Sequence, residues 1–462
     1  MSVRSTSLLV GVGATGGSMR VILIAIGSLG DTLPFLALGK ALLRRGHEVI
    51  LGGNSHYANV VERHGLQFEE VFSAEDYQGF LENYRRWTLR ESVDEGTRLM
   101  RLWMEKSHQL VLRRNLPGTT VVASVGCAFG ARIAQETLGI PLATVHLQPM
   151  WMRSVSDGTC LPPWFPRPFF RLVEGVVDVL IDGGLGKVTN AYRETLGLPP
   201  VKRLMRTWWH SPQLVLNLFP EWFSAPQPDW PTNTACTGFP RTDDLHDENV
   251  PEVEKYLAAG EPPLVFAQSS IGKDEGFFEV SRQIASRLGR RAILVTPKAS
   301  ATDCKRDLLA IRFLRLDHVL HRCSALIHHG GIGTIASALT AGVCQLTIPT
   351  LPDQFDNARR LERLGVSKVM KRKEYTADHG ARVLSGLLNS KVTNARCRHF
   401  SALAAADDGL SRACDALERL LAASTSRGVV AFPLIPRGHS QPDEESFSSR
   451  NLVMQVDQDR ND

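Results

Sequence analysis

Residues 327–364 read IHHGGIGTIASALTAGVCQLTIPTLPDQFDNARRLERL, and this pattern decides the fold. An apolar run ends in a glycine-rich turn at 329–333, and small, helix-compatible residues follow until Gly342. A second apolar run and a proline-rich bend then lead into another helix. Strand, glycine turn, helix and strand in this order make a βαβ unit, in which the two strands are parallel. We therefore predict an α/β protein built on doubly wound parallel sheets.

The glycine turn predicts a binding site for a phosphate or diphosphate. The first amides of a helix have no partner inside it, and the helix dipole favours negative charge at that end. Gly331 and Gly333 let the backbone approach a bulky anion, while His329 and Thr334 can donate hydrogen bonds to it. The alternative is that the turn only closes the corner between strand and helix. The spacing differs from both the Walker loop and the G-x-G-x-x-G dinucleotide fingerprint.

Asp353 and Gln354 follow the second strand, so we expect them at the same carboxyl edge of the sheet, where they can hold sugar hydroxyls. The two motifs, His-x-Gly-x-Gly-Thr and Pro-x-x-x-Asp-Gln, together resemble the donor-binding signature of nucleotide-sugar glycosyltransferases. That resemblance implies two Rossmann-like domains facing a cleft, the GT-B fold. It also implies a nucleotide-diphospho-sugar as co-substrate, with no cofactor. No metal is expected, since the site has no Asp-x-Asp pair and the helix dipole can stabilise the diphosphate.

A further motif, IAIGSLGDTLPF at 24–35, begins in the last residues of the first predicted strand, at 19–26, and continues past its end. Asp31 in this motif either caps the helix predicted at 34–45 or acts as a general base at the carboxyl edge of the strand. Antibiotic and sterol glycosyltransferases carry Gly-Asp-x-x-Pro here, with the Asp as base. The resemblance therefore implies that Asp31 is catalytic and that Gly30 lies against the acceptor.

Residues 150–181 break the alternation of strands and helices and are rich in Trp, Phe, Met and Pro. One interpretation is a helix packed on the first domain. The other is an irregular surface segment that forms an apolar acceptor channel and docks on lipid, because its prolines exclude a regular helix across the middle. On the second interpretation Trp151, Phe169 and Phe170 contact an apolar, hydroxylated acceptor. Peripheral contact with a membrane and a second subunit that supplies the acceptor both remain open.

Two sites in the second half complete the predicted donor pocket. Ser269 and Ser270 follow the strand at 263–268, where relatives have a Gly-Ser or Gly-Thr that faces the diphosphate. Phe313 stands where relatives place the aromatic ring that stacks on the nucleobase. The alternative for Phe313 is a place in the hydrophobic core.

Residues 210–240 narrow the resemblance. They contain HSPQ, LFPEWF, DWP and TGFP, and with 24–35 they resemble the bacterial rhamnosyltransferases of rhamnolipid synthesis, over 19–420. The implied reaction is inverting transfer of L-rhamnose from dTDP-rhamnose to a hydroxy-fatty-acid acceptor. The alternatives are glucose transfer from UDP-glucose to a sterol or polyketide, a sugar-nucleotide epimerase or hydrolase, and a non-catalytic nucleotide-binding partner.

Composition sets the remaining limits. The chain has 462 residues, 43% hydrophobic and 22% charged, which indicates a globular protein of two domains. Its net charge is +5, and the basic residues are scattered along the sequence and not clustered, so nucleic-acid binding is not indicated. Eight separated cysteines predict free thiols in a reducing cytosol, and no apolar run is long enough to span a membrane. The predicted parts are a flexible extension at 1–18, an acceptor-binding domain at 19–240, a linker at 241–262, a nucleotide-sugar-binding domain at 263–423 and a disordered tail at 424–462.

Overall fold

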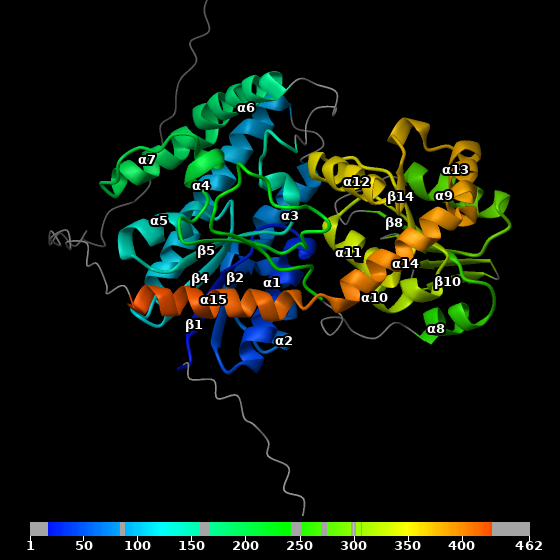
Figure 1. Cartoon of the computed structure of the whole chain (residues 1–462), viewed down its shortest axis with the longest axis horizontal. Coiled ribbons are helices and arrows are strands. Elements are labelled where there is room, and N and C mark those ends of the chain that lie inside the picture. Colours follow the sequence, from blue (N-terminus) through cyan, green and yellow to red (C-terminus); the bar gives the residue numbers. More distant parts are fainter. Residues whose placement is uncertain are drawn as a thin grey trace, which may run out of the picture. The chain divides into compact units, whose positions relative to one another are not determined.

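Two sheets of seven strands each occur in the described part of the chain, which comprises residues 17–83, 88–157, 167–241, 251–268, 275–296, 299, 302–305 and 307–426 of the computed structural model (Figure 1). The first sheet is parallel and has the order β3-β2-β1-β4-β5-β6-β7. Its strands are β1 (Arg20–Ile24), β2 (Glu48–Asn54), β3 (Gln67–Phe72), β4 (Thr120–Val125), β5 (Leu142–His146), β6 (Leu214–Asn217) and β7 (Thr234–Cys236). The chain moves outward in one direction from β1 and in the other from β4, so the point between them is where doubly wound folds bind ligands.

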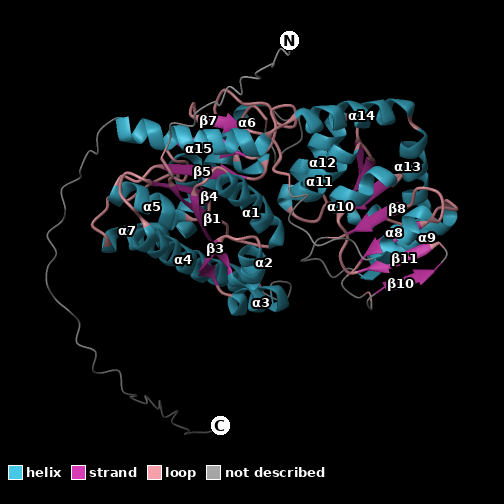
Figure 2. Ribbon diagram, turned by 90° about the horizontal axis from the view of Figure 1, so that it is seen from below, coloured by secondary structure: helices cyan, strands magenta, loops and turns pink. Residues whose placement is uncertain are grey.

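Helices cover both faces of the first sheet (Figure 2). The helices of this half of the chain are α1 (Leu29–Arg44), α2 (Ala58–Arg63), α3 (Ala74–Asn83), α4 (Leu89–Arg114), α5 (Phe129–Leu138), α6 (Arg167–Ile181) and α7 (Lys187–Thr195), with the short turns η1 (Ser55–Tyr57), η2 (Pro149–Trp151), η3 (Asp182–Gly186) and η4 (Leu204–Trp208). Val21 and Leu23 of β1 pack in one hydrophobic cluster with α1, while Ile22 and Ile24 pack in another with α4 and α5. Burial on both faces explains why β1 is an uninterrupted apolar run.

The second sheet repeats this arrangement, with the order β10-β11-β9-β8-β12-β13-β14. It is parallel except for β10, which pairs antiparallel with β11. Its strands are β8 (Leu264–Ala267), β9 (Ala292–Val295), β10 (Thr302–Lys305), β11 (Leu308–Ile311), β12 (Ala325–His328), β13 (Cys344–Thr347) and β14 (Ser367–Val369). The direction changes between β8 and β12, so the glycine turn after β12 lies at the equivalent ligand-binding edge. The predicted fold class is confirmed.

The helices of the second half are α8 (Pro251–Ala258), α9 (Glu275–Arg287), α10 (Leu316–Val319), α11 (Ile332–Ala341), α12 (Pro352–Leu364), α13 (Ala377–Asn389), α14 (Lys391–Ala406) and α15 (Gly409–Ser426), with the turns η5 (Leu320–Arg322) and η6 (Arg372–Glu374). α8 lies in the segment predicted to be a linker. Its residues Val253, Tyr256 and Leu257 are buried in a cluster with the second sheet, so this half of the segment is part of that domain's core.

The two last helices, α14 and α15, are separate. The carboxylate of Asp408 accepts a hydrogen bond from the Ser411 amide (3.1 Å) and so caps α15 as a separate helix. Cys414 and Leu417 of α15 then pack in the cluster of β1 and α1, with the first sheet. The end of the segment predicted as the second domain therefore packs on the first.

The predicted N-terminal extension lies outside the described residues up to position 16, and the predicted tail lies outside them from position 427. None of the described helices is long and apolar enough to cross a membrane. The cysteines in the described part that are free thiols, as predicted, are Cys127, Cys236, Cys323, Cys344, Cys397 and Cys414.

Candidate active site

The glycine turn between β12 and α11 has the predicted form. β12 ends at His328, and α11 begins directly after Gly331, its N-cap. A side chain at 331 would place its Cβ 2.4 Å from His329 Nε2, so glycine here leaves room for the imidazole in its present position. Gly333 and Thr334, in the first turn of α11, line a pocket at this helix end. Because the first amides of a helix lack partners inside it, this end can bind an anion.

The two histidines of the turn have different environments. His328 is fully buried; its Nδ1 accepts a hydrogen bond from the Gly330 amide (3.1 Å) and its Nε2 faces Gln345 Oε1 (3.0 Å), so it shapes the turn. His329 Nδ1 is buried and has no hydrogen-bond partner among the described residues. Burial lowers the pKa of His329 to about 4, although the Ala267 carbonyl favours the protonated ring. The imidazole of His329 is therefore neutral near pH 7 and donates from only one nitrogen.

Asp31 closes the N-terminus of α1. Its Oδ2 accepts hydrogen bonds from the amide (2.7 Å) and the hydroxyl (2.9 Å) of Ser28. This capping box starts α1 at Leu29, earlier than the predicted start at Pro34, which lies inside the helix. A side chain at Gly27 would place its Cβ 2.3 Å from Asp31 Oδ2, so glycine provides the space that the carboxylate occupies. Asp31 is thus a partner of the N-cap residue and not the N-cap itself.

The pKa of Asp31 is affected by residues from both halves of the chain. Burial raises the pKa of the Asp31 carboxyl, against the opposing effect of the bonds from Ser28. The charge of Asp353, on α12 of the second half, raises it further, so these two carboxylates lie near enough to act on each other. Tyr57 and Tyr77 share a hydroxyl–hydroxyl hydrogen bond (2.9 Å), and burial and the charge of Asp31 raise the pKa of both. No sequence signal indicates this tyrosine pair, because spacing alone does not bring 57 and 77 together.

Gln354 caps α12. Its side chain is buried, and its Oε1 accepts hydrogen bonds from the amides of Thr350 (2.9 Å) and Leu351 (3.1 Å). Its contact with a sugar hydroxyl stays a prediction. Asp353 is half-buried, and burial raises the pKa of its carboxyl. The side chain of Gln148 hydrogen-bonds this carboxylate and opposes that rise.

Asn357 and Gln148 connect these parts, and neither was predicted. Asn357 is fully buried, and its Nδ2 donates to the Gly330 carbonyl (3.1 Å) and to Gln148 Oε1 (3.3 Å). Gln148 follows β5 of the first sheet, so it links that sheet to the glycine turn and to Asp353. A signal for Asn357 exists in the sequence, since it stands four residues after Asp353 and therefore on the same face of α12. Gln148 has no such signal.

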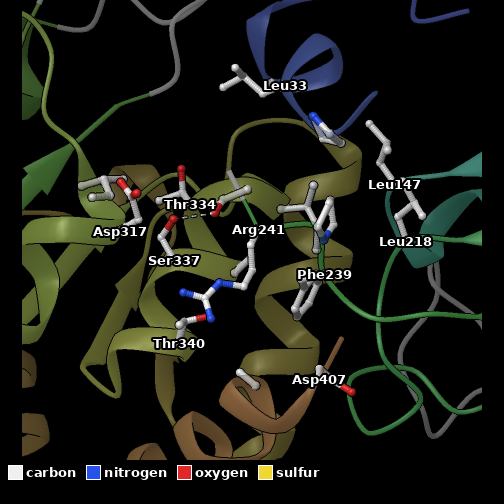
Figure 3. A pocket seen from close by; sticks show the side chains of 18 of the residues that line it. Leu33, Leu147, Leu218, Phe239, Arg241, Asp317, Thr334, Ser337, Thr340 and Asp407 are labelled. Atoms are coloured by element: carbon white, nitrogen blue, oxygen red, sulfur yellow. Dashed lines mark hydrogen bonds between the residues drawn. The ribbon is translucent and has the colours of Figure 1, made fainter. Parts of the chain in front are cut away.

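A pocket of about 310 Å³ lies at this edge of the two sheets (Figure 3). Thr334, Ser337 and Asp317 contribute side chains from the second half, and Leu33 and Leu147 contribute them from the first. The other lining residues are Gly30, Pro34, Leu218, Phe239, Pro240, Arg241, Phe313, Leu314, Leu316, Ile332, Gly333, Ala336, Thr340, Ala404 and Asp407.

Gly30 and Phe313 are thus both in the wall of this pocket. The side chain of Phe313 is 50% exposed, which excludes the core interpretation of this residue. β11 ends at Ile311, so Phe313 lies in the connection that follows the strand. Within the described ranges, no group of three or more His, Cys, Asp or Glu residues is arranged to hold a metal ion.

The predicted acceptor residues lie on η2 and α6. Trp151 is 37% exposed, and its ring centroid lies 6.0 Å from that of Trp209. α6 is a regular helix from Arg167 onward despite the prolines, because Pro168 falls in its first turn, where proline is tolerated. Four predicted site residues are not among the described side chains, namely Phe169, Phe170, Ser269 and Ser270.

Two protein-family models match the chain. Residues 21–156 match the glycosyltransferase family 28 N-terminal domain, and residues 292–416 match the C-terminal domain of erythromycin biosynthesis protein CIII-like proteins. The chain is 29% identical over 428 residues to O-mycaminosyltylonolide 6-deoxyallosyltransferase of Streptomyces fradiae, covering 87% of this chain and 97% of that protein. It is 26% identical over 433 residues to a sterol 3-beta-glucosyltransferase of Saccharomyces cerevisiae, covering 87% of this chain and 35% of that protein.

Solved structures share the fold. The glycotransferase of kitacinnamycin superposes with a TM-score of 0.68 at 19% identity, covering 87% of this chain and 99% of that one. The spinosyn rhamnosyltransferase SpnG, complexed with thymidine diphosphate, superposes with a TM-score of 0.60 at 16% identity, covering 87% and 100%. Both sheets, with their helices, therefore adopt the arrangement of two-domain glycosyltransferases.

Proposed function

We propose that this chain, a nucleotide-sugar glycosyltransferase of the GT-B fold, transfers L-rhamnose from dTDP-rhamnose to a hydroxyl of a hydroxy-fatty-acid or another lipid acceptor. The proposal depends mainly on one observation, which is that a candidate base and a candidate diphosphate site lie at the same edge of the two sheets. A carboxylate with a raised pKa follows β1, and an anion-binding helix end follows β12. A base and a diphosphate site are the two parts that displacement at a sugar carbon requires.

The donor is proposed from four features. The N-terminus of α11 suits a diphosphate, and the half-exposed ring of Phe313 suits a nucleobase. SpnG, which has the same fold, carries thymidine diphosphate in its solved complex. The motifs at 24–35 and 210–240 resemble those of bacterial rhamnosyltransferases and favour rhamnose as the sugar.

In the proposed mechanism a single displacement inverts the sugar carbon. Both bonds from Ser28 use Oδ2 of Asp31, so Oδ1 is the oxygen that takes the proton from the acceptor hydroxyl. The acceptor oxygen bonds to the anomeric carbon while the bond from that carbon to the diphosphate oxygen breaks. The leaving nucleoside diphosphate keeps the electron pair, and the amides of α11 with Thr334 stabilise its charge. Asp353 orients the sugar, and Gln148 holds Asp353.

The second candidate is glucose transfer from UDP-glucose to a sterol or polyketide-like acceptor. The similarity to a sterol glucosyltransferase and to an enzyme of macrolide glycosylation supports it. Mass spectrometry of products separates the two candidates. The purified chain is incubated with dTDP-rhamnose or UDP-glucose and with hydroxy-lipid, sterol and macrolide acceptors. A rhamnosylated hydroxy-lipid is the expected product, and transfer confined to a sterol or macrolide would replace the proposal with the second candidate.

Binding of thymidine diphosphate is expected to take up a proton at His329. In the free chain the pKa of this ring is about 4, so it is neutral, whereas a bound diphosphate favours the imidazolium and raises the pKa. The extra affinity is therefore largest below about pH 4 and is lost as pH rises through the raised pKa of the complex. Calorimetry in two buffers of different ionisation enthalpy measures the proton uptake. The matched control is His329→Gln, which cannot titrate, while the diphosphate's own titration is common to both proteins. Equal uptake by both proteins would remove His329 from the diphosphate site.

Activity is expected to rise with the acyl chain length of the acceptor, by up to ~0.8 kcal/mol in transition-state free energy for each methylene that becomes buried. Values of kcat/KM for a series of hydroxy-acyl acceptors measure this slope. Replacing Phe169 and Phe170 together by Ser is expected to flatten the slope and to leave the KM for the nucleotide-sugar unchanged. A wild-type rate that is independent of chain length would contradict a lipid acceptor.

A further inference from the structure

The outer face of α6 is apolar and uncovered. The side chains of Leu172, Val176, Val179 and Leu180 are 62%, 53%, 72% and 69% exposed. At 100° per residue these four positions fall within an arc of about 100° and form one stripe along the helix. Large apolar side chains that gather on one exposed face mark a site of contact with another surface. We call this set the α6 stripe.

The opposite face of α6, which is turned toward the domain, carries the buried carboxylate of Asp178. The apolar side chains thus point outward and a charged one points inward, the reverse of the usual surface helix. The carboxylate of Asp178 is 9% exposed and pairs with Arg153 Nη1 (2.7 Å) and Arg206 Nη1 (3.1 Å). Ile181, also on this side, packs in a cluster with Met104 of α4. The ion pairs fix which face points outward. The α6 stripe is therefore exposed because the buried contacts on the other side of α6 fix the orientation of the helix.

Basic residues border the C-terminal end of the α6 stripe. The carboxylate of Asp182, just after α6, accepts hydrogen bonds from the amides of Arg203 (2.6 Å) and Leu204 (2.9 Å), which brings the segment at 202–204 to this end of the helix. Lys187, Lys202 and Arg203 are exposed there. An apolar stripe with cations beside it has the composition of a helix that lies in the interface of an anionic bilayer.

We propose that the α6 stripe docks this chain on an anionic lipid bilayer, with the four apolar side chains among the acyl chains and the flanking cations on the headgroups. A second copy of the chain is a poorer occupant. Its own α6 stripe would bring Lys187, Lys202 and Arg203 of the same sign toward the interface, and like charges repel. This inference rests on the proposed lipid acceptor, because docking would place the chain where such an acceptor partitions.

Vesicle flotation with the full chain tests the proposal without a glycosyl-transfer assay. The chain is expected to float with vesicles of phosphatidylglycerol and phosphatidylcholine, to bind pure phosphatidylcholine more weakly, and to be released from the anionic vesicles by high salt. Val179→Asn combined with Leu180→Gln is expected to lower partitioning by about tenfold or more. Lys187→Glu combined with Arg203→Glu is expected to remove the preference for anionic vesicles.

The matched control is Val392→Gln on α14, because this side chain is 72% exposed, as Val179 is. It should float like the wild type, and circular dichroism should show that every variant is folded. Absence of wild-type flotation, or flotation unchanged by the α6 variants, would overturn the proposal. Self-association that the α6 variants remove, without flotation, would assign the stripe to a contact between copies. Transfer to a short, water-soluble hydroxy-acid measures the proposed reaction separately, and we expect the α6 variants to retain it.

Discussion

Replacing Asp31 by Asn is expected to lower turnover by about 10²-fold or more, which is the range for loss of a positioned base. The amide cannot take a proton from the acceptor hydroxyl. Its oxygen can still accept the hydrogen bonds that Ser28 now gives to Oδ2, so the start of α1 is preserved. Single-turnover kinetics with a saturating nucleotide-sugar measures the loss, and calorimetry with thymidine diphosphate should show unchanged affinity.

The matched control separates catalysis from helix capping. Ser28→Ala removes one partner of the capping box and leaves the carboxylate of Asp31 in place, so it should reduce stability by about 1 kcal/mol and affect turnover far less than Asp31→Asn does. The pH profile adds a second readout. Burial raises the pKa of Asp31, and the base must be ionised, so the wild-type rate should fall as pH drops through this raised pKa. Near-normal turnover in Asp31→Asn would leave Asp31 with a capping role alone.

The fold could be predicted from sequence because its signals are local. The apolar runs of β1 and β12, the glycines of 329–333 and the small residues of α11 each specify their own conformation within a few positions. Parallel strands with helical connections then leave few topologies, and ligands of such sheets bind at one edge. The positions of Asp31 and His329 at the carboxyl ends of β1 and β12 followed from these rules alone.

The parts that were missed depend on contacts between distant segments or on competition for one side chain. α15 packs on the first sheet through Cys414 and Leu417, and the sequence near 409–426 does not specify which sheet it covers. The capping role of Gln354 was not predicted, although its position three residues after Leu351 is that of a capping partner, and its Oε1 accepts hydrogen bonds from backbone amides. Gln148 and Asp353 lie far apart in the sequence, so their hydrogen bond depends on how the two halves of the chain pack.

Replacing Arg360 by Met is expected to lower the free energy of unfolding by about 3 kcal/mol, at the lower end of the range for a buried ion pair broken on one side. The side chain of Arg360 is 4% exposed; its Nε pairs with Asp356 Oδ2 (2.9 Å) and its Nη1 with Asp157 Oδ2 (2.7 Å). Without the guanidinium, the carboxylate of Asp356, which is 1% exposed, remains buried, and Arg359 Nη2 at 3.6 Å is the cation left beside it among the described residues. That remaining cation moderates the loss.

The same network joins the two halves of the chain, since Arg360 belongs to α12 and Asp157 follows β5, so its removal should loosen the helix that carries Asp353. Arg363→Met is the matched control: its guanidinium also pairs with Asp157 (3.1 Å) but is 52% exposed, and we expect a loss below about 1 kcal/mol.

Burial alone would raise the pKa of Asp157, but Arg360 and Arg363 hold it below its usual value. Because the pKa of Asp157 is lower in the folded chain, its ionised form stabilises the fold at any pH above the pKa of the unfolded chain, about 4. This stabilisation is lost as the pH falls through the lower pKa of the folded chain. Urea unfolding followed by tryptophan fluorescence should therefore show the gap between wild type and Arg360→Met narrowing below about pH 4. Equal losses for Arg360→Met and Arg363→Met at neutral pH would contradict this account, because they would mean that burial does not increase the contribution of an ion pair to the free energy of unfolding.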